Sequence, residues 1–141
     1  MSDQLILVLN CGSSSLKGAV IDRKSGSVVL SCLGERLTTP EAVITFNKDG
    51  NKRQVPLTGR NCHAGAVGML LNELEKHGLH DRIKAIGHRI AHGGEKYNES
   101  VLIDQAVMDE LKACIPLAPL HNPANINGIL AAQEHFPGLP N

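Results

Sequence analysis

The sequence predicts an α/β fold in which helices pack on a mixed β-sheet. The first observation behind this prediction is a uniformly apolar run from Leu5 to Leu9, which is typical of a strand covered on both faces in the middle of a sheet. The second is a change of period, because strand-like segments open the chain and a segment with helical spacing follows them. A chain of 141 residues is long enough for one compact domain with its own core, residues 1–141.

The first half of the chain is expected to be mainly β-structure. Turn-forming residues separate the apolar segments, and Asp49-Gly50 is a strong signal for a tight hairpin turn. We expect this hairpin to be a β-insertion at the surface. The predicted strands are 5–9, 16–21 and 27–33, which form a meander, followed by 42–46 and 54–57 on either side of the hairpin turn.

The second half is expected to be mainly helical. Residues 61–77 place apolar side chains at helical spacing, and Gly78 suits the position after a helix end. Residues 83–90 are predicted as a further strand. Asp104 can cap a helix that carries Val107, Met108 and Leu111 on one side, and Asn122-Pro123 can start a last helix with Ile126, Ile129 and Leu130 inward. The residues 136–141 have the chemistry of a connection from a helix to another strand.

Composition and charge exclude several kinds of partner. The 14 basic residues balance the 14 acidic ones, so no basic field is available to bind nucleic acid or anionic lipid. The longest apolar run is too short to span a membrane, and the N-terminus lacks the basic start of a signal peptide. The four cysteines are scattered without a CxxC pair, which favours free thiols in a reducing compartment. We therefore expect a cytoplasmic protein without nucleic-acid or membrane partners.

Three polar segments could carry chemistry. The segment from Leu9 to Lys17 places an amide, a glycine, three hydroxyls and an ammonium between two strands, a set that suits a phosphate. A hairpin turn rich in small residues is the alternative interpretation. A Walker A loop is excluded, because a strand rather than Ser/Thr on a helix follows the lysine.

The other two segments contain Arg89 and His121. Arg89 leaves a strand end, where its planar fork could hold a carboxylate or a phosphate, although a structural ion pair would explain it equally well. His88 and His92 would lie roughly 13 Å apart on an extended strand, too far to chelate one zinc ion. His121 precedes a helix N-terminus, where it could meet a bound anion or be an incidental surface residue.

Together the three segments resemble the signatures of the acetate kinases, in the superfamily of actin, sugar kinases and Hsp70 chaperones. The matching segments are 9–17, 86–94 and 116–123. The resemblance runs along the whole chain but covers only about the first third of a family member. It implies that the chain is the N-terminal lobe of such an enzyme, with a ribonuclease H-like (actin-like ATPase) α/β fold.

The resemblance also implies a function and a set of site residues. The reaction would be reversible phosphoryl transfer from ATP to acetate, which gives acetyl phosphate and ADP with Mg²⁺ (or Mn²⁺) bound, in a homodimer. Asn10 would bind the metal, and Ser13, Ser15 and Lys17 would face the nucleotide phosphates. Arg89 would hold the carboxylate or the migrating phosphoryl group, with His121 close to the transferring phosphate. Ala91 and Leu120 would line the pocket for the alkyl group.

Two alternative functions remain open at this point. A propionate kinase of the same family would differ only in pocket volume, and Ala91 stands where acetate-preferring members commonly carry valine. A catalytically idle nucleotide-binding module is the other alternative, but an arginine that holds a carboxylate has no purpose without an acceptor. Because further catalytic residues and the adenosine-binding lobe of the family lie beyond residue 141, we expect the isolated chain to be inactive.

Overall fold

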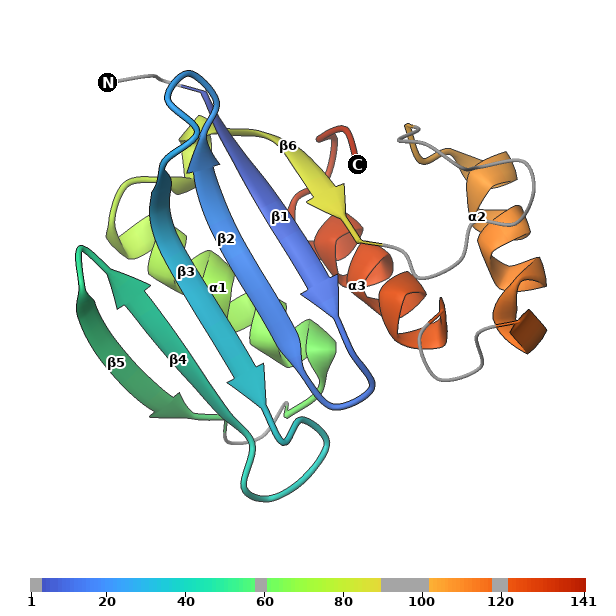
Figure 1. Ribbon diagram of the computed structural model, residues 1–141, viewed down its shortest axis with the longest axis horizontal. Helices are drawn as coiled ribbons and strands as arrows, with labels where there is room; N and C mark the ends of the chain where they lie inside the picture. Colours follow the sequence, from blue (N-terminus) through green and yellow to red (C-terminus); the bar gives the residue numbers. More distant parts are fainter. Residues whose placement is uncertain (1–3, 58–60, 90–101, 118–121) are drawn as a thin grey trace.

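The computed structural model describes residues 4–57, 61–89, 102–117 and 122–141. Within these ranges a single sheet and the helices packed beside it account for the regular structure (Figure 1). The strands are β1 (Leu5–Cys11), β2 (Leu16–Asp22), β3 (Val28–Glu35), β4 (Val43–Lys48), β5 (Asn51–Pro56) and β6 (Ile83–His88). The α-helices are α1 (His63–Lys76), α2 (Gln105–Ala113) and α3 (Asn122–His135), and the 3₁₀ turns are His80–Arg82 and Ile115–Leu117.

The six strands form one mixed sheet in the order β5-β4-β3-β2-β1-β6. Each strand from β1 to β5 is antiparallel to the next one along the chain, whereas β6 pairs with β1 in parallel. The predicted mixed sheet and hairpin are therefore confirmed. Asp49 and Gly50 both have positive φ, as the tight turn requires, and the hairpin extends the sheet at its edge rather than standing apart from it.

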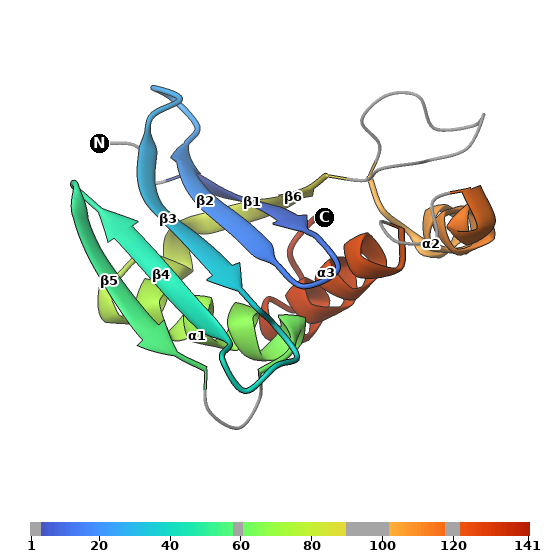
Figure 2. The same cartoon turned by 60° about the horizontal axis from the view of Figure 1, so that its bottom comes forward.

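Helices α1 and α3 cover one face of the sheet, and Figures 1 and 2 agree on this arrangement. The side chains of β1 alternate accordingly. Leu5, Leu7, Leu9 and Cys11 are buried against the helices, while the residues between them are only half-buried. The prediction that β1 is covered on both faces is thus wrong for the described part of the chain, because no helix there packs on its second face.

The apolar side chains form two separate clusters. The larger one lies between the sheet and the helices α1 and α3, with Leu7, Leu9, Leu70 and Leu74 among its fully buried members. The smaller one joins α2 to α3 through five residues: Val107, Met108, Leu111, Ile126 and Ile129. Helix α2 therefore packs on α3 through this cluster, and just before α2 the Ile103 amide donates to the Asn141 carbonyl at 2.9 Å.

Helix ends follow the local sequence, but one inward residue was predicted wrongly. The Asp104 carboxylate accepts a hydrogen bond from the Val107 amide at 2.9 Å, so the predicted N-cap of α2 is confirmed. Leu130 is 48% exposed, contrary to prediction, because α3 turns its buried sides toward the sheet, α1 and α2.

None of the described helices has the length and hydropathy that crossing a membrane requires.

Candidate functional site

The predicted site residues meet where β1 and β6 end side by side. These two strands are parallel neighbours, and Leu9 is the register partner of His88. The Arg89 amide donates to the Leu9 carbonyl at 3.0 Å, so the chain beyond each strand leaves the sheet at the same level. Ligands of α/β sheets commonly bind just outside the carboxyl ends of parallel strands.

Strand β2 places Lys17 at the same end of the sheet as Arg89, so that two cationic side chains lie there. Asn10 and Lys17 are direct partners across the antiparallel β1–β2 pair, so their side chains share the face of the sheet opposite to α1 and α3. The connecting loop is tight. The Gly12 amide donates to the Ser15 carbonyl at 2.9 Å, and a Cβ at position 12 would lie only 2.7 Å from Ser15 Oγ. A side chain at position 12 would therefore force the Ser15 hydroxyl out of its present position.

A depression of about 420 Å³ lies at the junction of these elements. Its lining residues are Asn10, Cys11, Gly12, Ser15, Lys17, Arg89 and Asn125. Lys17 and Arg89 are both exposed, and none of the lining residues is acidic. Within the described ranges Arg89 forms no ion pair with an acidic side chain. The depression thus offers two cations, an amide and a hydroxyl to an anion.

The structure brings together only part of the predicted site. Asn10, Ser15, Lys17 and Arg89 line the same depression. Ser13 is exposed in the adjoining loop and is not one of the lining residues. Ala91, Leu120 and His121 lie outside the described residues.

Two buried side chains that sequence reasoning missed contact backbone carbonyl oxygens at the start of the β1–β2 loop. His63 is only 7% exposed, and its Nε2 lies 2.6 Å from the Gly12 carbonyl oxygen. The Asn125 amide donates to the Cys11 carbonyl at 2.8 Å and is likewise buried. An asparagine beside Ile126 and Ile129 could have been noticed, since buried amides need partners. No comparable signal identifies His63.

The sulfur of Cys11 belongs to the packing of this region. Burial raises the pKa of the Cys11 thiol to about 11 and that of Cys32 to about 12. Both groups are therefore neutral thiols at physiological pH, and Cys11, the last residue of β1, is favoured as a packing residue over a nucleophile. All four cysteines are free.

The donor set constrains how a metal ion could bind. In the described part of the chain, no three His, Cys, Asp or Glu side chains are gathered to hold one. Mg²⁺, however, usually keeps several waters and takes only one or two protein oxygens when it is bound together with phosphates. The Asn10 amide oxygen could supply one such ligand, so the site fits a magnesium ion that arrives with a nucleotide, but not a metal cage built from protein alone.

Comparison with known proteins identifies the family. The model of the Acetokinase family matches residues 5–141. The chain is 97% identical over 141 residues to acetate kinase 2 of Neisseria meningitidis serogroup B, covering 100% of this chain and 35% of that protein. It is 50% identical over 134 residues to acetate kinase of Deinococcus radiodurans, covering 95% of this chain and 33% of the relative.

Solved structures agree with this result. A propionate kinase from Francisella tularensis matches with a TM-score of 0.92 at 40% identity, and Porphyromonas gingivalis acetate kinase matches with 0.90 at 36%. Each match covers 97% of this chain, and 35% and 36% of the respective structures. The predicted fold class is confirmed by these neighbours. The chain spans about 35% of the length of the curated relatives that it matches over its whole length, and it belongs to the acetokinase family.

Proposed function

We propose that the protein containing this chain transfers the γ-phosphoryl group of ATP reversibly to acetate, giving acetyl phosphate and ADP. In this proposal residues 1–141 are the N-terminal lobe, which binds the nucleotide phosphates and part of the acceptor. The observation that carries the proposal is the meeting of Asn10, Ser15, Lys17 and Arg89 around one depression without acidic residues. The family match supports the choice of reaction.

In this reaction the protein mainly positions the two reactants and stabilises their negative charge. A carboxylate oxygen of acetate attacks the γ-phosphorus while the bond to the β–γ bridging oxygen breaks, so ADP leaves and no proton needs to be removed from the acceptor. Both reactants are anions, and their approach is unfavourable unless cations offset the repulsion. Lys17 and Arg89, exposed at the same depression, are suited to this task.

We assign separate roles to the two cations. Lys17 is a point charge on a strand beside the Gly/Ser loop, so we expect it to bind nucleotide phosphate together with Ser13 and Ser15. Arg89 can form two parallel hydrogen bonds, so we expect it to hold the acetate carboxylate or the migrating phosphoryl group. We expect His121 to contact the transferring phosphate, and Ala91 and Leu120 to contact the methyl group of acetate.

The Asn10 amide oxygen would hold Mg²⁺ together with the nucleotide phosphates. When bound, the ion supplies neutralisation of phosphate charge. Asn10 faces the same side of the sheet as Lys17, so both groups can act on one phosphate chain. The protein would therefore bind Mg²⁺ tightly only when a nucleotide is bound. Titration of the protein with Mg²⁺ in the absence of ATP should show little affinity for the ion.

The proposal also covers the setting of the enzyme. We propose a cytoplasmic homodimer with ATP, ADP, acetate and acetyl phosphate as its small-molecule partners. The balanced charge of the chain supports the absence of nucleic-acid and membrane-surface partners. Mass measurement of the native protein would test the dimer.

A hydroxylamine assay on the full-length protein tests the activity, because acyl phosphates react with hydroxylamine to give coloured hydroxamates. We expect hydroxamate formation that needs ATP, Mg²⁺ and acetate together. Its absence in a folded full-length protein would refute the proposal. The isolated chain of 141 residues should be inactive in the same assay, and repurified chain with an Arg89-dependent activity would show that this lobe suffices.

Propionate is the second candidate acceptor, since a propionate kinase is among the solved structures that this chain resembles. The two acids differ by one methylene, which an apolar pocket separates by only about 1–3 kcal/mol. We therefore expect both to react, and acetate remains the first choice. Parallel kcat/KM measurements with the two acids decide the order.

A further inference from the structure

The loop between β1 and β2 is held by bonds that differ from those of a simple hairpin turn. The Gly12 amide donates to the Ser15 carbonyl at 2.9 Å, and the Ser14 carbonyl accepts from the Leu37 amide at 2.9 Å. In a closed turn the Gly12 carbonyl would accept from the Ser15 amide. Here it does not, because the Gly12 oxygen instead meets His63 Nε2 at 2.6 Å.

The chemistry of this contact fixes the proton on His63. A carbonyl oxygen can only accept a hydrogen bond, so Nε2 must carry the hydrogen. His63 is the first residue of α1 and only 7% of it is exposed, so its ring is confined between the helix and the loop. The contact joins residues 51 positions apart in the sequence, and it therefore exists only when α1 is docked on the sheet.

The direction of the Gly12 carbonyl determines where the next amide points. In a trans peptide the C=O and N–H bonds point in opposite directions, and no cis bond is present in the described chain. Since the Gly12 carbonyl points to His63, the Ser13 N–H points away from it. Within the described ranges the N–H groups of Ser13 and Ser15 make no hydrogen bond to the protein.

The preceding carbonyl is held in a similar way from a second helix. Asn125 in α3 donates to the Cys11 carbonyl at 2.8 Å. Two successive carbonyl oxygens, which would repel a phosphate, are thus engaged by buried donors from α1 and α3. The neighbouring amides, which would attract a phosphate, remain available.

We propose that His63 is a positioning residue for phosphate binding: its Nε2–H holds the Gly12 carbonyl and thereby keeps the Ser13 and Ser15 amides open to the phosphate oxygens of a nucleotide. This inference rests on the proposed function. It assigns a role in ligand binding to a residue that has no contact with the ligand itself. Without the donor, the Gly12 carbonyl can turn to the Ser15 amide and close the loop.

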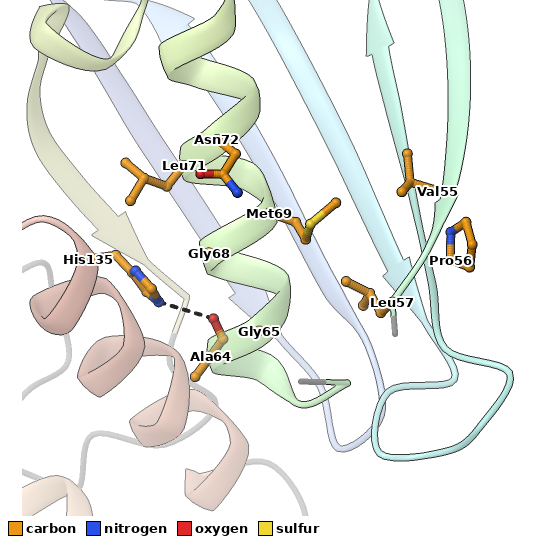
Figure 3. Close-up of a pocket in the computed structure, with 10 residues that line it drawn as sticks. All are labelled: Val55, Pro56, Leu57, Ala64, Gly65, Gly68, Met69, Leu71, Asn72 and His135. Atoms are coloured by element: carbon orange, nitrogen blue, oxygen red, sulfur yellow. Dashed lines mark hydrogen bonds between the residues drawn. The ribbon is translucent and has the colours of Figure 1, made fainter. Parts of the chain in front are cut away.

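The test uses four variants of the full-length protein. His63→Leu removes the donor, and His63→Asn keeps a polar side chain whose amide is too short to replace Nε2. His63→Gln places an amide N–H near the Nε2 position. His135→Leu is the matched control, because the Nε2 of this half-buried histidine also meets a backbone carbonyl, that of Ala64, at 3.2 Å, in a separate groove beside α1 (Figure 3).

The measured quantities are the affinities for ATP and for adenosine, determined by calorimetry in the absence of acetate. We expect His63→Leu and His63→Asn to bind ATP about 10- to 100-fold more weakly, the effect of losing one or two hydrogen bonds to a charged group. Adenosine lacks phosphates and should bind equally well to all variants. His63→Gln should keep ATP affinity within about threefold of the parent, less than the value of one ordinary hydrogen bond. His135→Leu should leave it unchanged.

Three outcomes would overturn the inference. Parent-like ATP affinity in His63→Leu or His63→Asn would show that the loop needs no donor. An equal loss for ATP and adenosine would show a general structural defect, and so would failure of His63→Gln to restore binding. If instead the parent binds ATP but forms no hydroxamate from acetate, the proposed function fails while the role of His63 can still be measured.

Discussion

The contact between Gly128 and Cys11 makes a sharp prediction about how α3 is docked beside the loop. A Cβ built on Gly128 would lie 2.5 Å from Cys11 Sγ and 3.2 Å from Cys11 Cβ, far closer than ordinary contact. Cys11 is buried at the end of β1, and α3 contacts this strand. In Gly128→Ala, therefore, α3 and β1 must move apart by on the order of 1 Å, or the Cys11 side chain must find another rotamer.

The magnitude follows from two opposing effects. Overpacking of a core costs about 1–3 kcal/mol, whereas replacing a helical glycine by alanine contributes about 1 kcal/mol of stability. We therefore expect Gly128→Ala to destabilise the protein by about 1 kcal/mol, within a range of 0 to 2. The control is Gly68→Ala in α1, where the new Cβ would meet only the ring of His135, at 3.3 Å. This control should be neutral or stabilising.

Urea unfolding of the full-length protein measures both variants, and a double variant isolates the contact. Cys11→Ala removes the sulfur, so Gly128→Ala combined with Cys11→Ala should be more stable than the sum of the single effects by about 1 kcal/mol. Strict additivity would refute the reasoning, because residues in direct contact should couple. Stabilisation by Gly128→Ala equal to that of Gly68→Ala would refute it as well.

Three further predictions concern the site and its neighbours. Arg89→Ala should lower kcat/KM for acetate by on the order of 100-fold with little rescue by lysine, because a bidentate contact is lost; a value within about threefold of the parent would make the arginine merely structural. Ala91→Val should lose propionate activity selectively, since two methyl groups fill the space, and an unchanged acetate-to-propionate ratio would show that position 91 does not face the alkyl group. Burial raises the pKa of Cys11 from 9.0 to about 11 and that of Cys32 to about 12, so both thiols ionise more readily in the unfolded chain than in the folded one. Their contribution to the free energy of unfolding is therefore fully present below pH 9 and is lost as the pH rises from 9 to 12. Urea midpoints at pH 8 and 10 should show this loss, Cys32→Ala should reduce it, and an equal loss in that variant would point to other groups.

The local elements of the fold were open to prediction because short-range chemistry decides them. Asp49-Gly50 adopts the positive φ angles of a tight turn within a few residues, whatever the rest of the chain does. Asp104 caps α2 through an amide only three residues away. The Gly/Ser composition of the β1–β2 loop and the arginine after β6 likewise indicate an anion site through residue type and spacing alone.

The sequence by itself also determined the family, since its three signatures lie in short continuous segments. The sequence did not predict which residues pack against those segments. Leu130 and Ile129 are adjacent and similarly apolar, yet only Ile129 is buried, because the positions of α1, α2 and the sheet around α3 decide which side faces inward. Periodicity gives the faces of a helix but not the number of its neighbours.

Only the tertiary structure placed His63 and Asn125 under the loop. Each forms its bond to a carbonyl that is 51 or 114 residues away in sequence, and each bond depends on a helix docked against the end of β1. The loop sequence supplies the atoms that can bind a phosphate, but a free peptide with this sequence could turn its carbonyls or its amides toward the ligand. The choice between them is made by buried donors on α1 and α3, because only a packed core holds such donors at a fixed distance from the loop.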